Sequence, residues 1–241
     1  SSGLNSLIWT VQHEKSPLAL KTIHEYAHHL RSREFSELIR ELDNRLVAIS
    51  NKVGIIPQES KFILDLESIF TQGNEQYELE LESYTFFKNL VDHKLKEFWL
   101  TISNSHIESL SFNYYSWKYL KDNPDKFNSI AKLNDPNVYF NQIRKLNYID
   151  NLQIEIPQSI NLLTNLKKLN IRHNYIKKLP ESLFHMKSLQ VLDFSHNQIK
   201  RIPESIIKLN NIESLIIHDN YINSFSNSIK NYLSSIKDCK F

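Results

Sequence analysis

Glycine is scarce in this chain of 241 residues, which contains only Gly3, Gly54 and Gly73. A phosphate-binding P-loop and a dinucleotide-binding loop each need several glycines at short, fixed spacing. No three glycines of this sequence lie close enough together to build either loop. The scarcity therefore excludes the nucleotide-binding classes that depend on a glycine-rich turn.

Cysteine and long apolar runs are also nearly absent. The single cysteine, Cys239, cannot form an intrachain disulfide and cannot supply the thiolate set of a zinc knuckle. No apolar run reaches the roughly 18 residues of a membrane-spanning helix, and no basic and apolar leader opens the sequence. Ser1-Ser2-Gly3 reads as an expression scar and the only methionine is Met186, so the sequence leaves open whether the native N-terminus is missing. We expect a cytoplasmic protein that does not contact membranes.

A pattern of 23 residues repeats in the C-terminal half, where Pro157, Pro180 and Pro203 have this spacing. Each copy runs through three apolar residues of a Leu-x-x-Leu-x-Ile type, an asparagine, and two more apolar residues before the proline or its replacement. The three full copies begin at Leu166, Leu189 and Ile212, and their asparagines are Asn174, Asn197 and Asn220. A weaker copy spans 143–163, with Asn151 and with Gln153 at an apolar position. A still weaker first copy has Ile107, Leu110 and Phe112.

This pattern resembles the leucine-rich repeat, and its 23-residue form is similar to that of scribble-like and Ras-associated repeat proteins. The resemblance is specific over residues 143–225 and extends from about 105 to 241. It implies an α/β fold in which short parallel strands stack into a curved solenoid. A unit of this size cannot bury its own apolar face, so units must stack and the ends need caps. We expect residues 105–241 to form the repeat domain with a C-terminal cap over 231–241.

Three features of each copy have a physical role in such a stack. The Leu-x-Leu core of each copy places two side chains on one face of a short strand. The recurring asparagines fall where the chain turns off the strand, and their amides can pair buried backbone groups. The prolines begin the return segment, where a fixed φ is compatible with the start of a helix.

Helical spacing of apolar residues dominates the first hundred residues. The periodicity predicts helices over 17–50, 58–72 and 75–102, with Gly54 and Pro57 between the first two. Residues 1–104 are therefore predicted to form an α-helical domain, of no recognised family, that caps the N-terminal end of the solenoid.

One motif in this helical region suggests catalysis. His24-Glu25-Tyr26-Ala27-His28 matches His-Glu-x-x-His, which resembles the zinc site of metallopeptidases. On a helix, His24 and His28 face one metal and Glu25 can activate a bound water. A catalytic zinc needs a third protein ligand, and no nearby residue supplies one. We favour a structural role; the alternative is a zinc metallopeptidase-like domain whose repeats recognise the substrate.

A second metal candidate lies in the repeats. His173, His196 and His218 are predicted to lie near one another at the strand ends, although Arg172 and Asp219 intrude and the third histidine is shifted by one position. We expect no metal at this place and no cofactor in the protein.

The leading functional hypothesis is a non-catalytic module that binds a partner protein on the concave face of the repeats, as a scaffold or recognition subunit. Extended solenoid surfaces serve this purpose. The predicted binding residues are the exposed strand positions Lys145, Asn147, Lys168, Asn170, Arg172, Val191, Asp193, Ser195, Ile216 and His218. Basic pairs such as Lys177-Lys178 are expected to be solvated, because aromatic residues do not interleave with them. We expect a monomer that does not bind nucleic acid.

Overall fold

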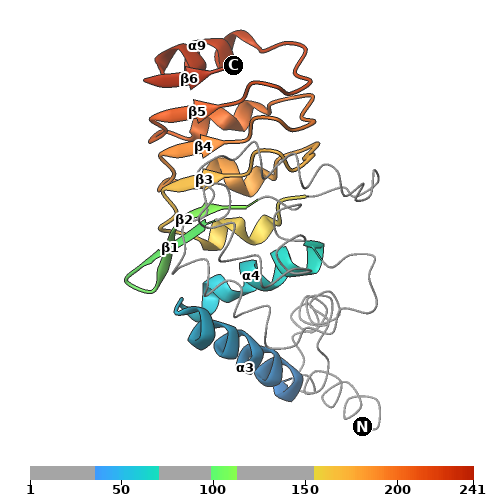
Figure 1. Cartoon of the computed structure of the whole chain (residues 1–241), viewed down its shortest axis with the longest axis vertical. Helices are drawn as coiled ribbons and strands as arrows, with labels where there is room; N and C mark the ends of the chain where they lie inside the picture. Colours follow the sequence, from blue (N-terminus) through green and yellow to red (C-terminus); the bar gives the residue numbers. More distant parts are fainter. Residues whose placement is uncertain (1–35, 71–98, 113–154) are drawn as a thin grey trace, which may run out of the picture. The chain divides into compact units, whose positions relative to one another are not determined.

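The computed structural model describes residues 36–70, 99–112 and 155–241 (Figure 1). The chain divides into two compact units, Ser1–Lys88 and Asn89–Phe241, which we treat separately. The division comes earlier in the chain than the expected boundary after residue 104. The expected helical segments 17–35 and 75–98 lie outside the described residues.

The described part of the first unit is a pair of helices, α3 (Ser36–Val53) and α4 (Pro57–Phe70), which pack against each other. α3 ends where Gly54 takes a φ of 85°, a left-handed conformation that glycine adopts without steric cost. The Ser50 carbonyl at the helix end accepts hydrogen bonds from the Gly54 N–H at 2.8 Å and from the Ile55 N–H at 3.2 Å. Pro57 begins α4, where its missing N–H costs nothing. The predicted helices are confirmed within 36–70.

The second unit is built on a six-stranded sheet in the order β1-β2-β3-β4-β5-β6. The strands are β1 (Trp99–Ser103), β2 (His106–Ser111), β3 (Lys168–Asn170), β4 (Val191–Asp193), β5 (Ser214–Ile216) and β6 (Asp238–Lys240). Neighbours from β2 to β6 are parallel, and β1 is antiparallel to β2. The return segments are η3 (Gln158–Leu162), η4 (Glu181–His185), η5 (Glu204–Lys208) and α9 (Asn227–Ser235). They form a second layer behind the strands (Figure 1).

The sheet begins with a hairpin that the helical periodicity did not predict. Residues 99–102 were expected to end a helix, and this prediction is wrong because they form β1 instead. Asn104 and Ser105 both have positive φ, 50° and 62°, which is the geometry of a tight hairpin turn. Leu100 pairs with Leu110 across the hairpin and both are buried. Burial on one face of the sheet thus takes precedence over the upstream helical pattern.

The first described strand of the parallel stack comes from the weak first copy of the repeat. The weak first copy is confirmed, because Leu110 of β2 pairs with Leu169 of β3. Among the described residues, β3 pairs with β2 on one side and with β4 on the other. The strand expected at 143–149 lies outside the described residues. The buried residues Ile107, Leu110 and Phe112 supply the apolar positions of the first copy.

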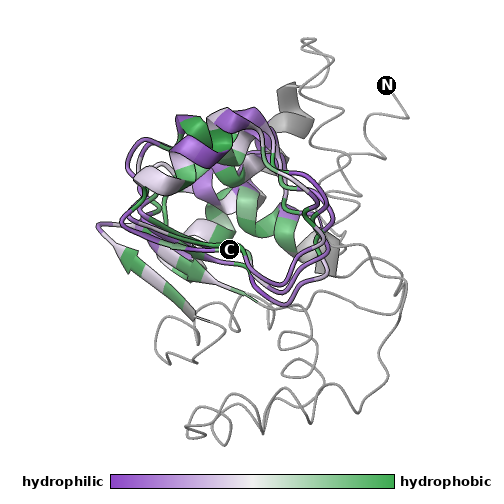
Figure 2. Cartoon of the chain, turned by 90° about the horizontal axis from the view of Figure 1, so that it is seen from above, coloured by the Kyte–Doolittle hydropathy of each residue, from purple (hydrophilic) through white to green (hydrophobic). Residues whose placement is uncertain are grey.

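The core lies between the strands and the return segments. One inward row consists of Leu169, Leu192 and Leu215, and a second consists of Ile171, Phe194 and Ile217; all are 0–2% exposed. Viewed along the stack, the loops of successive repeats trace the same path (Figure 2). This regular stacking is what the 23-residue period predicts.

The asparagine ladder is confirmed at three positions. The side-chain N–H₂ of Asn197 donates to the carbonyls of Phe194 in its own repeat (2.9 Å) and Ile171 in the preceding one (3.0 Å). Asn174 and Asn220 make the equivalent pairs of bonds, with Ile171 and Phe112 and with Ile217 and Phe194. Each amide therefore links two adjacent turns. Asn151 lies outside the described residues.

The C-terminal cap contains more structure than the fading pattern suggested. Pro157, Pro180 and Pro203 each precede a short 3-10 helix, whereas Ser226 at the next position caps the longer helix α9. The Ser226 hydroxyl accepts a hydrogen bond from the Ile229 N–H at 3.2 Å. After α9 the chain returns as β6, a strand that the sequence did not predict.

Candidate functional site

The parallel register places residues of successive repeats in rows across the outward face of the sheet, which we call the strand face. One row is Lys168, Val191, Ser214 and Asp238, and the other is Asn170, Asp193, Ile216 and Lys240. Side chains alternate along a strand, so both rows point away from the core leucines between them. The sheet thus presents a surface whose chemistry is set by the variable positions of each repeat.

Most of the predicted binding positions on this face are accessible. Lys168 is exposed, and Asn170, Arg172, Val191, Ile216 and His218 are partly exposed; Lys145 and Asn147 lie outside the described residues. Asp193 and Ser195 contradict the expectation, because they are only 7% and 1% exposed.

Hydrogen bonding explains why these two residues are buried. Oδ1 of Asp193 accepts from the Ser195 N–H at 3.0 Å and from the Ser195 hydroxyl at 2.7 Å. Asn170, one repeat earlier, accepts from the Arg172 N–H at 3.2 Å in the same way. A short polar side chain at this position therefore closes a turn at the end of the strand. Asp193 and Ser195 have a structural explanation that Lys168 and Val191 lack.

A polar cluster lies just beyond the ends of β3, β4 and β5. His173, His196 and Asp219 occupy the same position of three successive repeats, and each has a positive φ of 52–58°. Histidine and aspartate are among the few residues that tolerate this left-handed conformation. Their side chains, together with His218, form what we call the histidine–aspartate cluster.

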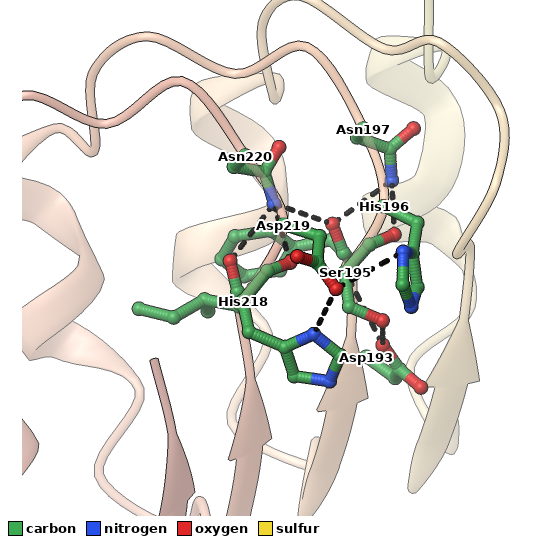
Figure 3. Close-up of polar contacts among 9 residues, drawn as sticks. Asp193, Ser195, His196, Asn197, His218, Asp219 and Asn220 are labelled. Carbon is green, nitrogen blue, oxygen red and sulfur yellow. Dashed lines mark hydrogen bonds and ion pairs between the residues drawn. The ribbon is translucent and has the colours of Figure 1, made fainter.

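The cluster is organised around one carboxylate oxygen (Figure 3). Oδ2 of Asp219 lies 2.8 Å from Nδ1 of His218 and 3.2 Å from Nδ1 of His196. The His173 ring stacks on the His196 ring at a centroid distance of 4.1 Å and an interplanar angle of 8°. The proximity of the three histidines is therefore as expected, and Asp219 lies between two of them.

These contacts shift two protonation equilibria. Burial lowers the pKa of His196, and the Asp219 charge opposes this shift. The hydrogen bond from His218 lowers the pKa of Asp219, with further contributions from the charges of the histidines. The Asp219 carboxylate is thus favoured in its charged form.

From the sequence we expect Asp219 to intrude among the histidines, whereas its carboxylate lies at the centre of the cluster. The available signal was its spacing of 23 residues from His196, which is itself 23 residues from His173. That spacing puts the three side chains in one column of the stack.

Two other sequence motifs were candidates for a functional site. The motif of His24, Glu25 and His28 lies outside the described residues. The basic pair Lys177-Lys178 is exposed, as expected. In the part of the chain that the structure describes, no helix has the length and apolar character needed to cross a membrane.

Comparison with known proteins agrees with this architecture. Residues 164–222 match the family model of the leucine-rich repeat, so this part of the chain consists of leucine-rich repeats. No curated protein matches the sequence.

Two solved structures are similar to part of the chain. A leucine-rich repeat protein of Leptospira interrogans is 28% identical over 36% of this chain and 22% of its own, with a TM-score of 0.32. An internalin from Listeria monocytogenes is 27% identical over 37% of this chain and 25% of its own, with a TM-score of 0.33. The similarity covers a quarter or less of either protein.

Proposed function

We propose that the second unit is a non-catalytic module that binds a partner protein on the strand face. The observation that carries the proposal is the contrast between the inward and outward residues of the same strands. Inward positions repeat as leucine, whereas outward positions vary from Lys168 to Val191 to Ser214. The fold requires the first set, whereas accessible outward residues such as Lys168 and Val191 are free to recognise a ligand.

The composition of the strand face supports a protein as the partner. Val191 and Ile216 are partly exposed apolar side chains, and their neighbours on the adjacent strands include the charged residues Lys168 and Lys240, respectively. Protein interfaces combine apolar contact area with polar groups in this way. A polyanion would favour a face with a continuous positive charge, and Asp238 interrupts any such charge.

Site-specific photo-crosslinking tests the proposal. A benzophenone amino acid at Val191 samples the strand face, and the same group at Ile207 of η5 samples the return-segment layer. Ile207 is 41% exposed, so both side chains are accessible to a partner. We expect a discrete crosslinked protein from Val191 that is absent, or several-fold weaker, at Ile207.

The same experiment can contradict the proposal. Equal crosslinking from Val191 and Ile207 indicates non-specific contact, and crosslinking from Ile207 alone places the partner on the opposite layer. Both variants should retain the melting transition of the wild-type chain, because each change is made at an accessible position.

A further inference from the structure

We propose that the histidine–aspartate cluster binds a divalent transition-metal ion of the zinc type through His196, His218 and Asp219, which reverses the sequence-based expectation of no metal at this place. This site is distinct from the His24–His28 motif, and it does not depend on the proposed protein-binding function.

The geometry of the three side chains carries the inference. Each offers one ligand atom, and these atoms all lie within 4.8 Å of one another. The separations of 2.8 and 3.2 Å to Oδ2 of Asp219 are close to the edge of a tetrahedral site, about 3.4 Å for metal–ligand distances of about 2.1 Å. Within residues 36–70, 99–112 and 155–241, no other set of three histidine, cysteine or acidic side chains meets this condition.

The backbone holds the ligands in place before any ion arrives. The His196 N–H donates a 3.1 Å hydrogen bond to the His218 carbonyl, so the two ligand-bearing turns are joined directly. The side-chain N–H₂ of Asn220, the residue after Asp219, donates a 3.0 Å hydrogen bond to the Phe194 carbonyl of the preceding repeat. The stacked ring of His173 restrains the His196 ring from one side. Such supporting contacts orient metal ligands and strengthen binding.

The chemistry of the ligands selects the class of ion. Two imidazoles and one carboxylate suit zinc, copper and nickel, whereas magnesium and calcium prefer sites made of oxygen ligands. Three protein ligands leave a fourth position of the tetrahedron for water or another donor.

The local charge is compatible with a cation although it is mixed. The positive charge of Arg172 near His196 opposes the binding of a cation. The negative charges of Asp193 and Asp219 favour it. The His196, His218 and Asp219 side chains are 35%, 39% and 60% exposed, so an ion reaches them from solvent.

Zinc titration of the untagged full-length chain, followed by calorimetry in a non-chelating buffer, tests the inference. Asp219→Asn removes the carboxylate but keeps a residue that tolerates positive φ, and His218→Gln removes one imidazole. We expect each to weaken zinc binding by about ten-fold or more. Cobalt(II) should give the intense visible absorption of a four-coordinate site in the wild type, and Asp219→Asn should abolish it.

Two control variants separate this site from other histidines. His185→Gln removes an exposed histidine on η4 that contacts Lys208 and the Glu181 carbonyl, and it should leave zinc affinity unchanged. The paired change His24→Gln and His28→Gln should also leave it unchanged. Absence of zinc binding by the wild type overturns the inference, and so does binding that survives Asp219→Asn but is lost in the paired variant.

Discussion

The backbone N–H of Asn174 donates a 3.1 Å hydrogen bond to the side-chain oxygen of Asn197, one repeat further along the chain. The same oxygen accepts from the Ile176 N–H at 2.9 Å. Its N–H₂ group donates to the carbonyls of Ile171, Phe194 and Ser195, so Asn197 pairs five backbone groups of two successive turns. The side chain thus replaces the strand pairing that ends where the chain turns.

Replacing Asn197 with alanine should therefore destabilise the second unit. Its five buried partners would lose these hydrogen bonds, and we expect a loss of about 1–3 kcal/mol in the free energy of unfolding. Urea denaturation followed by circular dichroism measures this loss. Asn210→Ala, at an exposed position, is the matched control and should change stability by less than about 0.5 kcal/mol. Equal stability of both variants would contradict the ladder.

Asp193→Ala tests whether Asp193 on the strand face has a structural role rather than a binding role. Because the buried carboxylate pairs the N–H and hydroxyl of Ser195, its removal should lower the free energy of unfolding by about 1–3 kcal/mol. Ser214→Ala removes an exposed hydrogen bond to Asp238 and serves as the control, with an expected loss below about 0.5 kcal/mol. If Asp193→Ala unfolds at the wild-type urea concentration, the carboxylate is not structural.

Tyr232 links α9 to the preceding repeat, because its hydroxyl donates a 2.8 Å hydrogen bond to the Leu209 carbonyl. Burial raises the pKa of this hydroxyl to about 12, which keeps it a neutral donor at physiological pH. Tyr232→Phe should lower the free energy of unfolding by about 0.5–1.5 kcal/mol. Tyr221→Phe is the control, because Tyr221 is 61% exposed. A wild-type melting temperature for Tyr232→Phe would show that the hydroxyl does not hold α9.

Cys239 on β6 offers a pH-dependent test of the cap. Burial, and then the charge of Asp238, raise the pKa of its thiol above 9.0. The folded state favours the neutral thiol, so this contribution to stability is present below pH 9.0 and is lost as the pH rises through the folded-state pKa.

The rate of alkylation by iodoacetamide measures how far the Cys239 thiol is kept neutral, since only the thiolate reacts and the chain has one cysteine. At pH 8 the folded protein should react several-fold more slowly than the urea-unfolded protein. Equal rates would show that Cys239 is not protected and that β6 does not form the last strand.

Periodic residues of the repeats made most of the second unit predictable from the sequence. Leu169, Leu192 and Leu215 recur at a fixed period that only a stack of repeats can bury, so the repeats, the asparagine ladder and the strands β3, β4 and β5 were predicted correctly. β6 was not predicted. β1 was missed because it is fixed by pairing Leu100 with Leu110 rather than by a local signal. The capping role expected of the first unit stays a prediction.

The candidate site was predicted less well, for a similar reason. Alternation along a strand identifies outward positions such as Lys168, but it does not show that Asp193 folds back onto Ser195. The central place of Asp219 depends on the order of stacking and on a left-handed turn, neither of which is visible in one repeat alone.

The affinity of the crosslinked partner for variants of the strand face tests the central claim most directly. Arg172→Ala combined with Val191→Ser changes two accessible positions of neighbouring repeats, and Ile207→Ser is the matched change on the opposite layer. Calorimetry with the purified partner should give a Kd at least ten-fold weaker for the double variant, about 1.4 kcal/mol, and an unchanged Kd for Ile207→Ser, with wild-type melting for both. An unchanged Kd for the double variant would contradict the account.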